Sequence, residues 1–77
     1  MTDTQTVEYA NLWAIHSEKE GRPAMCGWAR SEAEAAKEME RMKKADPEPG
    51  TTSYWVLRMT RHEVDQFKQT GFIPADA

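Results

Sequence analysis

The stretches SEAE at residues 31–34 and TRHE at residues 60–63 decide how this chain folds. In each, a hydroxyl side chain is followed three positions later by a glutamate, which is the pattern of a helix-capping box. The hydroxyl oxygen accepts a hydrogen bond from the backbone N–H of the glutamate, and the glutamate carboxylate accepts one from the N–H of the capping residue. Both stretches directly follow an apolar run with aromatic residues. We therefore predict two helices, each beginning after a strand.

Before the first of these helices, the sequence predicts a hairpin of two strands. The run from Glu8 to Ser17 is short, rich in aromatic residues and apolar on both faces, which is typical of a central strand. A charged loop at residues 18–22, which contains Gly21, leads into a return strand from Pro23 to Ala29. Pro23 cannot donate a hydrogen bond to a neighbouring strand, so we expect this strand at an edge. Alternation predicts Ala24, Cys26 and Trp28 on one side and Met25 and Gly27 on the other.

The first predicted helix runs from Glu32 to about Ala45, and the turn DPEPG at residues 46–50 ends it. The second predicted helix runs from Arg61 to about Thr70, and Gly71 follows where a left-handed C-cap belongs. Small and flexible side chains on the first helix let it lie close to a sheet, so we expect it to cover one sheet face. These predicted inner-face residues are Ala33, Ala35, Ala36, Met39 and Met42.

Between the helices, the run from Thr51 to Met59 is the clearest strand of the chain. A helical crossover makes the second and third strands parallel, which places the third beside the first in the order 2-1-3. The predicted fold is α+β: a three-stranded antiparallel sheet with one long helix on it and a short C-terminal helix at an end or edge. We expect a leader at residues 1–6, a single domain at 7–74 and a tail at 75–77. The third strand divides Trp55, Leu57 and Met59 from Tyr54, Val56 and Arg58.

Composition narrows the class of protein. Of the 77 residues, 39% are hydrophobic, and 13 acidic against 10 basic side chains give a net charge of −3. A negative chain is disfavoured as a nucleic-acid binder, because such binding depends on Lys and Arg displacing the counterions of phosphate. The sequence has a single cysteine, no apolar run of the roughly 20 residues that span a bilayer, and no signal-peptide pattern in its first residues. We expect a cytoplasmic protein with no membrane contact.

The residues that could carry chemistry do not form a pattern. His16, Cys26 and His62 are the only soft or nitrogen ligands, and their spacing is not that of a zinc site. Cys26 is interpreted as a buried structural thiol, because no base lies beside it in the sequence. The carboxylates fall mainly on helix faces and in loops, and each glycine has a turn, bulge or cap explanation. We therefore predict no catalytic residue, no cofactor and no metal.

A sheet with one helix on it leaves its other face partly open, and aromatic and arginine side chains on such a face favour binding. The primary hypothesis is a protein-binding module; the alternative is a nucleic-acid-binding accessory protein that uses the open aromatic face. A homodimer formed through that face or through an unpaired strand edge is also compatible with the sequence. The predicted binding residues are Tyr54, Arg58, Arg61, His62 and Trp28, with Trp13 as the alternative if the other face is open.

Residues 13–59 combine a charged hairpin, the stretch WARSEAEA at 28–35 that opens a helix, and a returning aromatic strand. This layout is similar to that of small phage and prophage proteins of β-β-α-β type, among them the small phage inhibitor of bacterial RNA polymerase and several anti-CRISPR proteins. The resemblance implies a non-enzymatic phage or mobile-element protein that inhibits a large host protein complex by occupying a functional surface. It lies in the architecture, so no functional residue is carried over by position.

Overall fold

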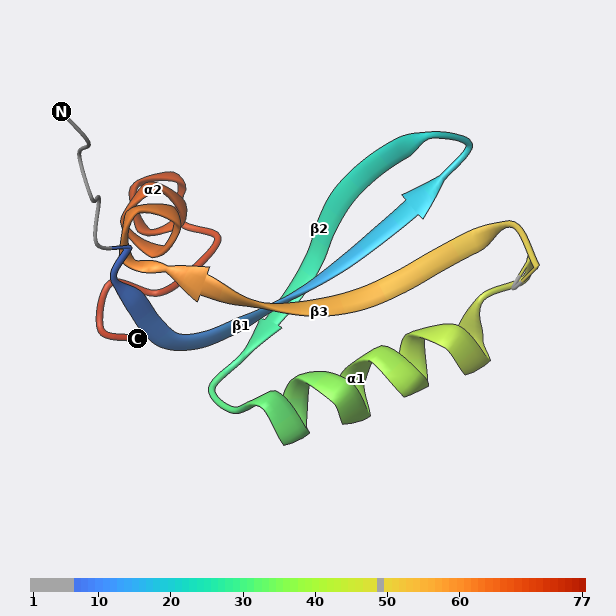
Figure 1. The fold of residues 1–77 in the computed structure, drawn as a ribbon, viewed down its shortest axis with the longest axis horizontal. Helices are drawn as coiled ribbons and strands as arrows, with labels where there is room; N and C mark the ends of the chain where they lie inside the picture. The colour runs from blue at the N-terminus through green and yellow to red at the C-terminus, as the bar shows by residue number, and fades with distance from the viewer. Residues whose placement is uncertain (1–6, 49) are drawn as a thin grey trace, which may run out of the picture.

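The computed structural model describes residues 7–48 and 50–77. The three strands form an antiparallel sheet in the order β2-β1-β3, so the predicted α+β fold, its strand order and the central place of the first strand are confirmed. The leader predicted at residues 1–6 lies outside the described residues. The elements follow one another as β1 (Tyr9–Lys19), β2 (Arg22–Ala29), α1 (Glu32–Ala45), β3 (Thr52–Thr60) and α2 (Arg61–Thr70) (Figure 1).

The hairpin between β1 and β2 is tighter than predicted. Lys19 pairs with Arg22, so only Glu20 and Gly21 form the loop. Both have positive φ angles, 54° at Glu20 and 74° at Gly21. This is the pattern of a type I′ turn, whose twist matches that of the flanking strands. The charged residues on either side of the loop therefore belong to the strands.

The two helix caps differ. At α2 the box is complete, because Thr60 Oγ1 accepts from the Glu63 N–H at 3.1 Å and Glu63 Oε1 accepts from the Thr60 N–H at 2.9 Å. At α1, Ser31 Oγ accepts from the Glu34 N–H at 3.1 Å, but within the described residues no return bond reaches Glu34. The reciprocal prediction is therefore wrong at α1. Glu63 is half-buried, whereas Glu34 is exposed.

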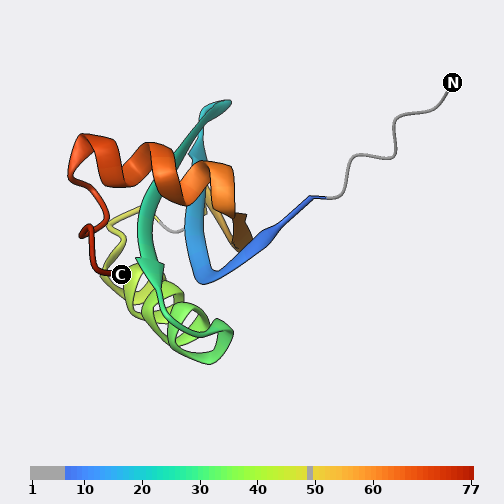
Figure 2. The same ribbon diagram turned by 90° about the vertical axis from the view of Figure 1, so that its left-hand side faces the viewer.

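The helices lie on opposite sides of the sheet (Figure 2). α1 runs under one face, where a Cβ atom on Gly27 would lie only 3.1 Å from Met42 Cε and 3.3 Å from Ile15 Cδ1. The absence of a side chain at Gly27 thus allows α1 to come close to the sheet. α2 contacts β1 and β3 on the other face, at the end of the sheet where β1 begins (Figure 1). The short helix was predicted at an end or edge, and it covers one end of this second face.

Two groups of buried side chains hold these layers. On the α1 face, Ile15 and Ala35 are fully buried. Ala33, predicted on the inner face of the helix, is exposed, because the line facing the sheet passes through Ala35 and Met39 instead. Ile73, which the sequence interpretation left unassigned, is fully buried, and Ala77 also packs against the core. The buried cluster on the α2 face consists of Leu12, Ala14, Met59, Val64 and Ile73.

A β-bulge at Cys26 overturns the predicted sides of β2. Ile15 pairs with Gly27 and His16 with Met25, so Cys26 is one residue too many opposite β1. Met25 and Trp28 therefore both pack on the α2-side cluster, whereas Cys26 and Gly27 both lie beside Met42 of α1. Cys26 is exposed rather than buried, and its thiol donates to the Ile15 carbonyl at 3.4 Å.

Candidate interaction surface

Neither sheet face is open along its whole length. α1 covers the face that carries Ile15 and its pairing partner Val56, and α2 covers the other face around Met59. Because the helices cover opposite ends, each face keeps an uncovered part (Figures 1 and 2). Arg58 lies in one of these parts, level with the end of β2, since both Arg58 and Ala29 pair with Trp13.

An irregularity of β1 places the Arg58 side chain. Between the pairs Tyr9–Thr60 and Trp13–Arg58, three residues of β1 lie opposite the single residue Met59 of β3. The guanidinium of Arg58 occupies this irregularity: its Nε donates to the Ala10 carbonyl at 2.8 Å, and its Nη2 donates to Asn11 Oδ1 at 2.8 Å. The Arg58 side chain therefore provides a hydrogen-bond donor for the Ala10 carbonyl, which is not paired in the interrupted ladder.

The same guanidinium lies near two aromatic rings. Its central carbon is 5.8 Å from the centre of the Tyr9 ring and 5.2 Å from the centre of the Trp13 ring, within cation–π range. Tyr9 is 54% exposed, and Leu57, on the edge strand beside Arg58, is 55% exposed. A hollow of about 490 Å³ is bordered by Tyr9, Leu57, Arg58 and Thr60. Leu57 pairs with Ala14 and so faces the α2 side of the sheet, which means that it borders this hollow from the sheet edge. We call Tyr9, Trp13 and Arg58, with Leu57 at that edge, the Tyr9 patch.

A second hollow, of about 480 Å³, begins on the other side of Tyr9. It lies between the first residues of β1 and one side of α2, and three cationic side chains line it: Arg30, Arg61 and Lys68. Arg61 and Lys68 are seven positions apart on α2, so they share one helix face. Asp65 also lines the hollow. We call Arg30, Arg61 and Lys68, with the β1 residues beside them, the basic groove.

The predicted binding residues are only partly brought together. Arg58 meets Trp13, the alternative residue, and Arg61 lies in the adjoining basic groove. His62 is exposed in the first turn of α2 but borders neither hollow. Trp28 lies on the opposite sheet face, packed on the core cluster, with the Arg30 guanidinium 5.3 Å from its ring.

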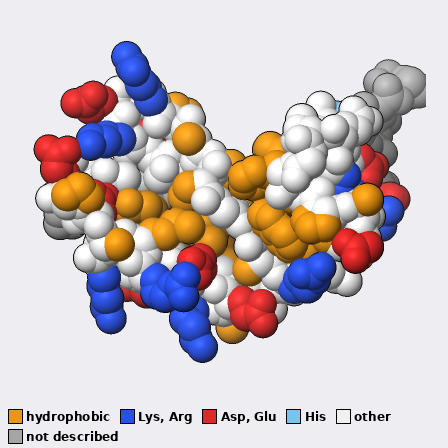
Figure 3. Space-filling view, turned by 180° about the vertical axis from the view of Figure 1, so that it is seen from behind, with side chains coloured by type: hydrophobic (Ala, Val, Ile, Leu, Met, Phe, Trp, Pro, Cys, Tyr) orange, Lys and Arg blue, Asp and Glu red, His pale blue; other side chains and the backbone are white. Residues whose placement is uncertain are grey.

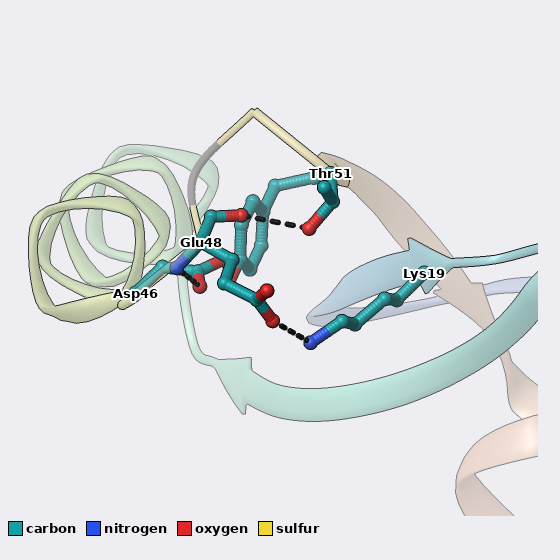
Figure 4. Close-up of polar contacts among 5 residues, drawn as sticks. Lys19, Asp46, Glu48 and Thr51 are labelled. Carbon is teal, nitrogen blue, oxygen red and sulfur yellow. Dashed lines mark hydrogen bonds and ion pairs between the residues drawn. The ribbon is translucent and has the colours of Figure 1, made fainter.

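Tyr54 lies away from this surface, toward the hairpin end of β3, where it pairs with Ser17. Its hydroxyl donates to Asp46 Oδ2 at 2.8 Å, which joins β3 to the end of α1. Asp46 Oδ1 accepts from the Glu48 N–H at 2.8 Å, and the Glu48 carboxylate pairs with Lys19 at 2.7 Å (Figure 4). Thr51 Oγ1 completes the cluster by donating to the Glu48 carbonyl at 2.9 Å. Tyr54 therefore has a structural bond at this end of the sheet.

The polar cluster shifts the pKa values of its members. The Glu48 N–H, and next the Tyr54 hydroxyl, lower the pKa of Asp46 below its usual value. The hydrogen bond to Asp46 raises the pKa of Tyr54, and the bond to Glu48 raises that of Lys19. Both effects follow from hydrogen bonds and charges that favour one protonation state. The cluster ties the hairpin to the loop after α1.

Tyr9 was missed as a binding residue. The sequence shows that Tyr9 alternates with Asn11 and Trp13 on one strand face. However, Arg58, whose side chain contacts both rings, lies 45 positions beyond Trp13. Only the register of β1 with β3 brings them together.

A further apolar area lies on the α2 face, toward the hairpin. There, His16 and Trp55 stack with their ring centres 5.7 Å apart. Figure 3, seen from the β2 side, shows apolar side chains gathered in a saddle between the two ends of the molecule. Within the described residues, an arginine held between two aromatic rings occurs in the Tyr9 patch and not on this saddle.

Two findings concern metal ions and membranes. Among residues 7–48 and 50–77, no group of three or more His, Cys, Asp or Glu side chains is placed to hold a metal ion. No helix in that part of the chain is long and apolar enough to cross a membrane.

Comparison with known proteins finds no matching family model, no matching curated protein and no matching solved structure.

Proposed function

We propose that this protein is a non-enzymatic protein-binding module and that the Tyr9 patch is its contact surface. The observation that supports this most is an arginine near two aromatic rings, Tyr9 and Trp13, of which Tyr9 is more than half exposed. Tyr, Trp and Arg are the residues in which the binding energy of protein interfaces concentrates. Tyr9, and Leu57 at the edge of the sheet, supply apolar area that a partner can remove from water.

The patch is also organised before any partner arrives. Two hydrogen bonds and two ring contacts hold the Arg58 guanidinium. Ordering a long, free side chain at an interface costs about 0.5–1.5 kcal/mol. Because Arg58 is already held in place, a partner that binds here avoids most of that cost.

This arrangement favours protein over nucleic acid as the partner. Single-stranded nucleic acid binds by stacking bases on exposed aromatic faces along a row of cations. Here the Arg58 guanidinium already lies over the rings of Tyr9 and Trp13, so it competes with a base for stacking on them. The net charge of −3 also disfavours a nucleic-acid partner, because it repels the phosphate backbone.

The biological role that we propose is inhibition of a larger protein complex, as the resemblance of the layout to that of small phage inhibitors implies. A chain of 77 residues offers little room for an enclosed active site, so it acts by covering a surface of its target. In this proposal the protein acts in the cytoplasm of the host of a phage or mobile element.

Site-specific photo-crosslinking tests the contact surface. A photoreactive amino acid is placed at Leu57, at Tyr9 or, as the matched control, at Lys44, which is exposed on α1 away from the patch. After irradiation in a nuclease-treated bacterial lysate, we expect one protein adduct from Leu57 and Tyr9 and none from Lys44. Equal adducts from all three positions, or an adduct with nucleic acid in an untreated lysate, would overturn the proposal.

A further inference from the structure

The basic groove differs in charge from the protein as a whole. The chain carries a net charge of −3, yet three of the four charged side chains that line this hollow are cationic. Within the described residues, Arg30, Arg61 and Lys68 take part in no ion pair, because the pairs found there are made by Lys19, Arg41 and Lys43. Asp65 and Ala77 also line the hollow, but cations outnumber carboxylates among its side chains, so the groove is a local positive site.

The cationic side chains come from separate parts of the fold that are fixed to one another. The backbone N–H of Arg61 donates to the Glu8 carbonyl at 2.9 Å, which ties the start of α2 to the start of β1. Arg30 lies over the Trp28 ring, between β2 and α1. The fold thus sets the places of Arg61 and Lys68 relative to β1, while Arg30 stands in the short connection between β2 and α1. Such fixed places favour a ligand of defined shape.

The groove also borders a piece of β1 that β2 does not pair with, and Ala77 lines the same hollow. β2 pairs with β1 only from Trp13 onward, where Trp13 is opposite Ala29. Ala10, Asn11 and Leu12 therefore have no partner from β2, and all three line the groove. Backbone groups on such an edge can pair with an added extended segment, the mode of recognition called β-augmentation.

We propose that the basic groove binds an extended acidic segment of the partner protein, with main-chain bonds to residues 10–12 and carboxylates placed against Arg30, Arg61 and Lys68. This inference rests on the proposed function and specifies the chemistry of the partner. Because Tyr9 borders both hollows, a segment in the groove is continuous with a partner surface on the Tyr9 patch. Arginine is well suited to carboxylates, because its planar group donates two parallel hydrogen bonds.

The basic groove suits a nucleic acid less well than an acidic peptide. Three cations around one hollow are few for a phosphate backbone, whose binding grows with the number of neutralised phosphates. Asp65 stands within the same hollow and repels closely spaced phosphates. A peptide can place its carboxylates away from Asp65, because they are spaced by the residues between them.

The test uses a defined probe, a fluorescein-labelled peptide of alternating glutamate and glycine. Binding is measured by fluorescence anisotropy against the matched glutamine–glycine peptide and a thymidine octanucleotide. We expect the glutamate peptide to bind at least about tenfold more tightly than either control, since roughly 1.4 kcal/mol from the added ion pairs suffices. Equal binding of the two peptides would overturn the inference, and so would tighter binding of the octanucleotide.

Variants locate the site. Arg61→Gln with Lys68→Gln should weaken binding of the glutamate peptide about tenfold or more, whereas Lys44→Gln with Lys37→Gln, the same charge change on α1, should leave it within about twofold. Circular dichroism melting confirms that each variant is folded. Backbone amide shifts of ¹⁵N-labelled protein should move at residues 10–12 and 61–68, and shifts confined to residues 32–45 would overturn the assignment.

The same variants separate this inference from the proposed function. If the Leu57 adduct persists in Arg61→Gln with Lys68→Gln at undiminished yield, the groove is not part of the contact and the acidic-segment inference fails, while the Tyr9 patch stands. If the unaltered protein gives no Leu57 adduct, the proposed function fails, and the peptide titration still decides whether the groove binds carboxylates.

Discussion

Arg58 and Trp13 stand opposite each other in the β1–β3 ladder, with the guanidinium carbon 5.2 Å from the centre of the indole ring. Cross-strand partners in an antiparallel sheet lie on the same face, so the register of the sheet creates this contact. Two hydrogen bonds from Arg58 to Ala10 and Asn11 fix it further. The arginine is thus both part of the proposed contact surface and a support of the strand that carries Tyr9.

Arg58→Lys tests that support. Lysine keeps the positive charge but cannot donate to both acceptors from one planar group. We expect the free energy of unfolding in urea to fall by about 1–2 kcal/mol, the cost of a lost hydrogen bond and a weakened ring contact. Arg22→Lys, at the exposed end of β2, is the control and should change stability little. If the two variants are equally stable, Arg58 does not form these bonds in solution, and the patch is not ordered before a partner binds.

Asp46 predicts a dependence of stability on acid. Its folded-state pKa is lowered, chiefly by the Glu48 N–H and then by the Tyr54 hydroxyl. A lowered pKa contributes stability that is present above the pKa of the unfolded chain, usually 3.8, and is lost as the pH falls through the folded-state value. Between about pH 5 and pH 2, Asp46→Asn should therefore lose less stability than the unaltered protein. Chemical unfolding across this range measures it, with Asp76→Asn as the control; identical slopes for the unaltered protein and Asp46→Asn would contradict the assignment.

We expect that a substitution at Glu20 can stabilise the protein. It has a φ of 54° in the two-residue hairpin loop, a conformation that costs most side chains about 1–2 kcal/mol. Asparagine tolerates it well, and Asn-Gly is the preferred pair for such a turn. Glu20→Asn should raise the free energy of unfolding by about 0.5–1 kcal/mol. Glu20→Gln removes the charge but keeps the strain, so a gain of the same size in Glu20→Gln would show that charge, not conformation, is responsible.

We expect truncation of Ile73 to lower the stability of the protein strongly. Its side chain is fully buried among Leu12, Met59 and Val64, although it follows the last helix of the chain. Ile73→Ala should lower the free energy of unfolding by about 2–5 kcal/mol, because it removes buried methylene groups and leaves a cavity. Leu57→Ala removes a similar volume from an exposed position and should cost far less. Equal effects of the two changes would mean that residues after α2 do not pack as the structure shows.

The sequence alone determined the local elements and their order. The hydroxyl–glutamate spacing at Thr60 and Glu63, the left-handed glycine at Gly71 and the alternation of β3 act over a few residues, so they can be recognised without knowing the fold. The rules of strand connection then led to the order β2-β1-β3. The local elements were predictable because each depends on hydrogen bonds and backbone angles of neighbouring residues, and the strand order because the crossover from the second to the third strand has one allowed hand.

Only the tertiary structure decided what lies on which side. Periodicity separates the two faces of a strand, but it does not say which helix covers which face, or over what length. A bulge at Cys26 regrouped the expected sides of β2, so that Met25 lies with Trp28 and Cys26 with Gly27. The irregularity between Tyr9 and Trp13 created the place that Arg58 fills. Ile73 is buried because the chain after α2 returns to the sheet. Such features depend on packing between distant residues, whose energy exists only once the layers have assembled, and the candidate surface at Tyr9 is one of them.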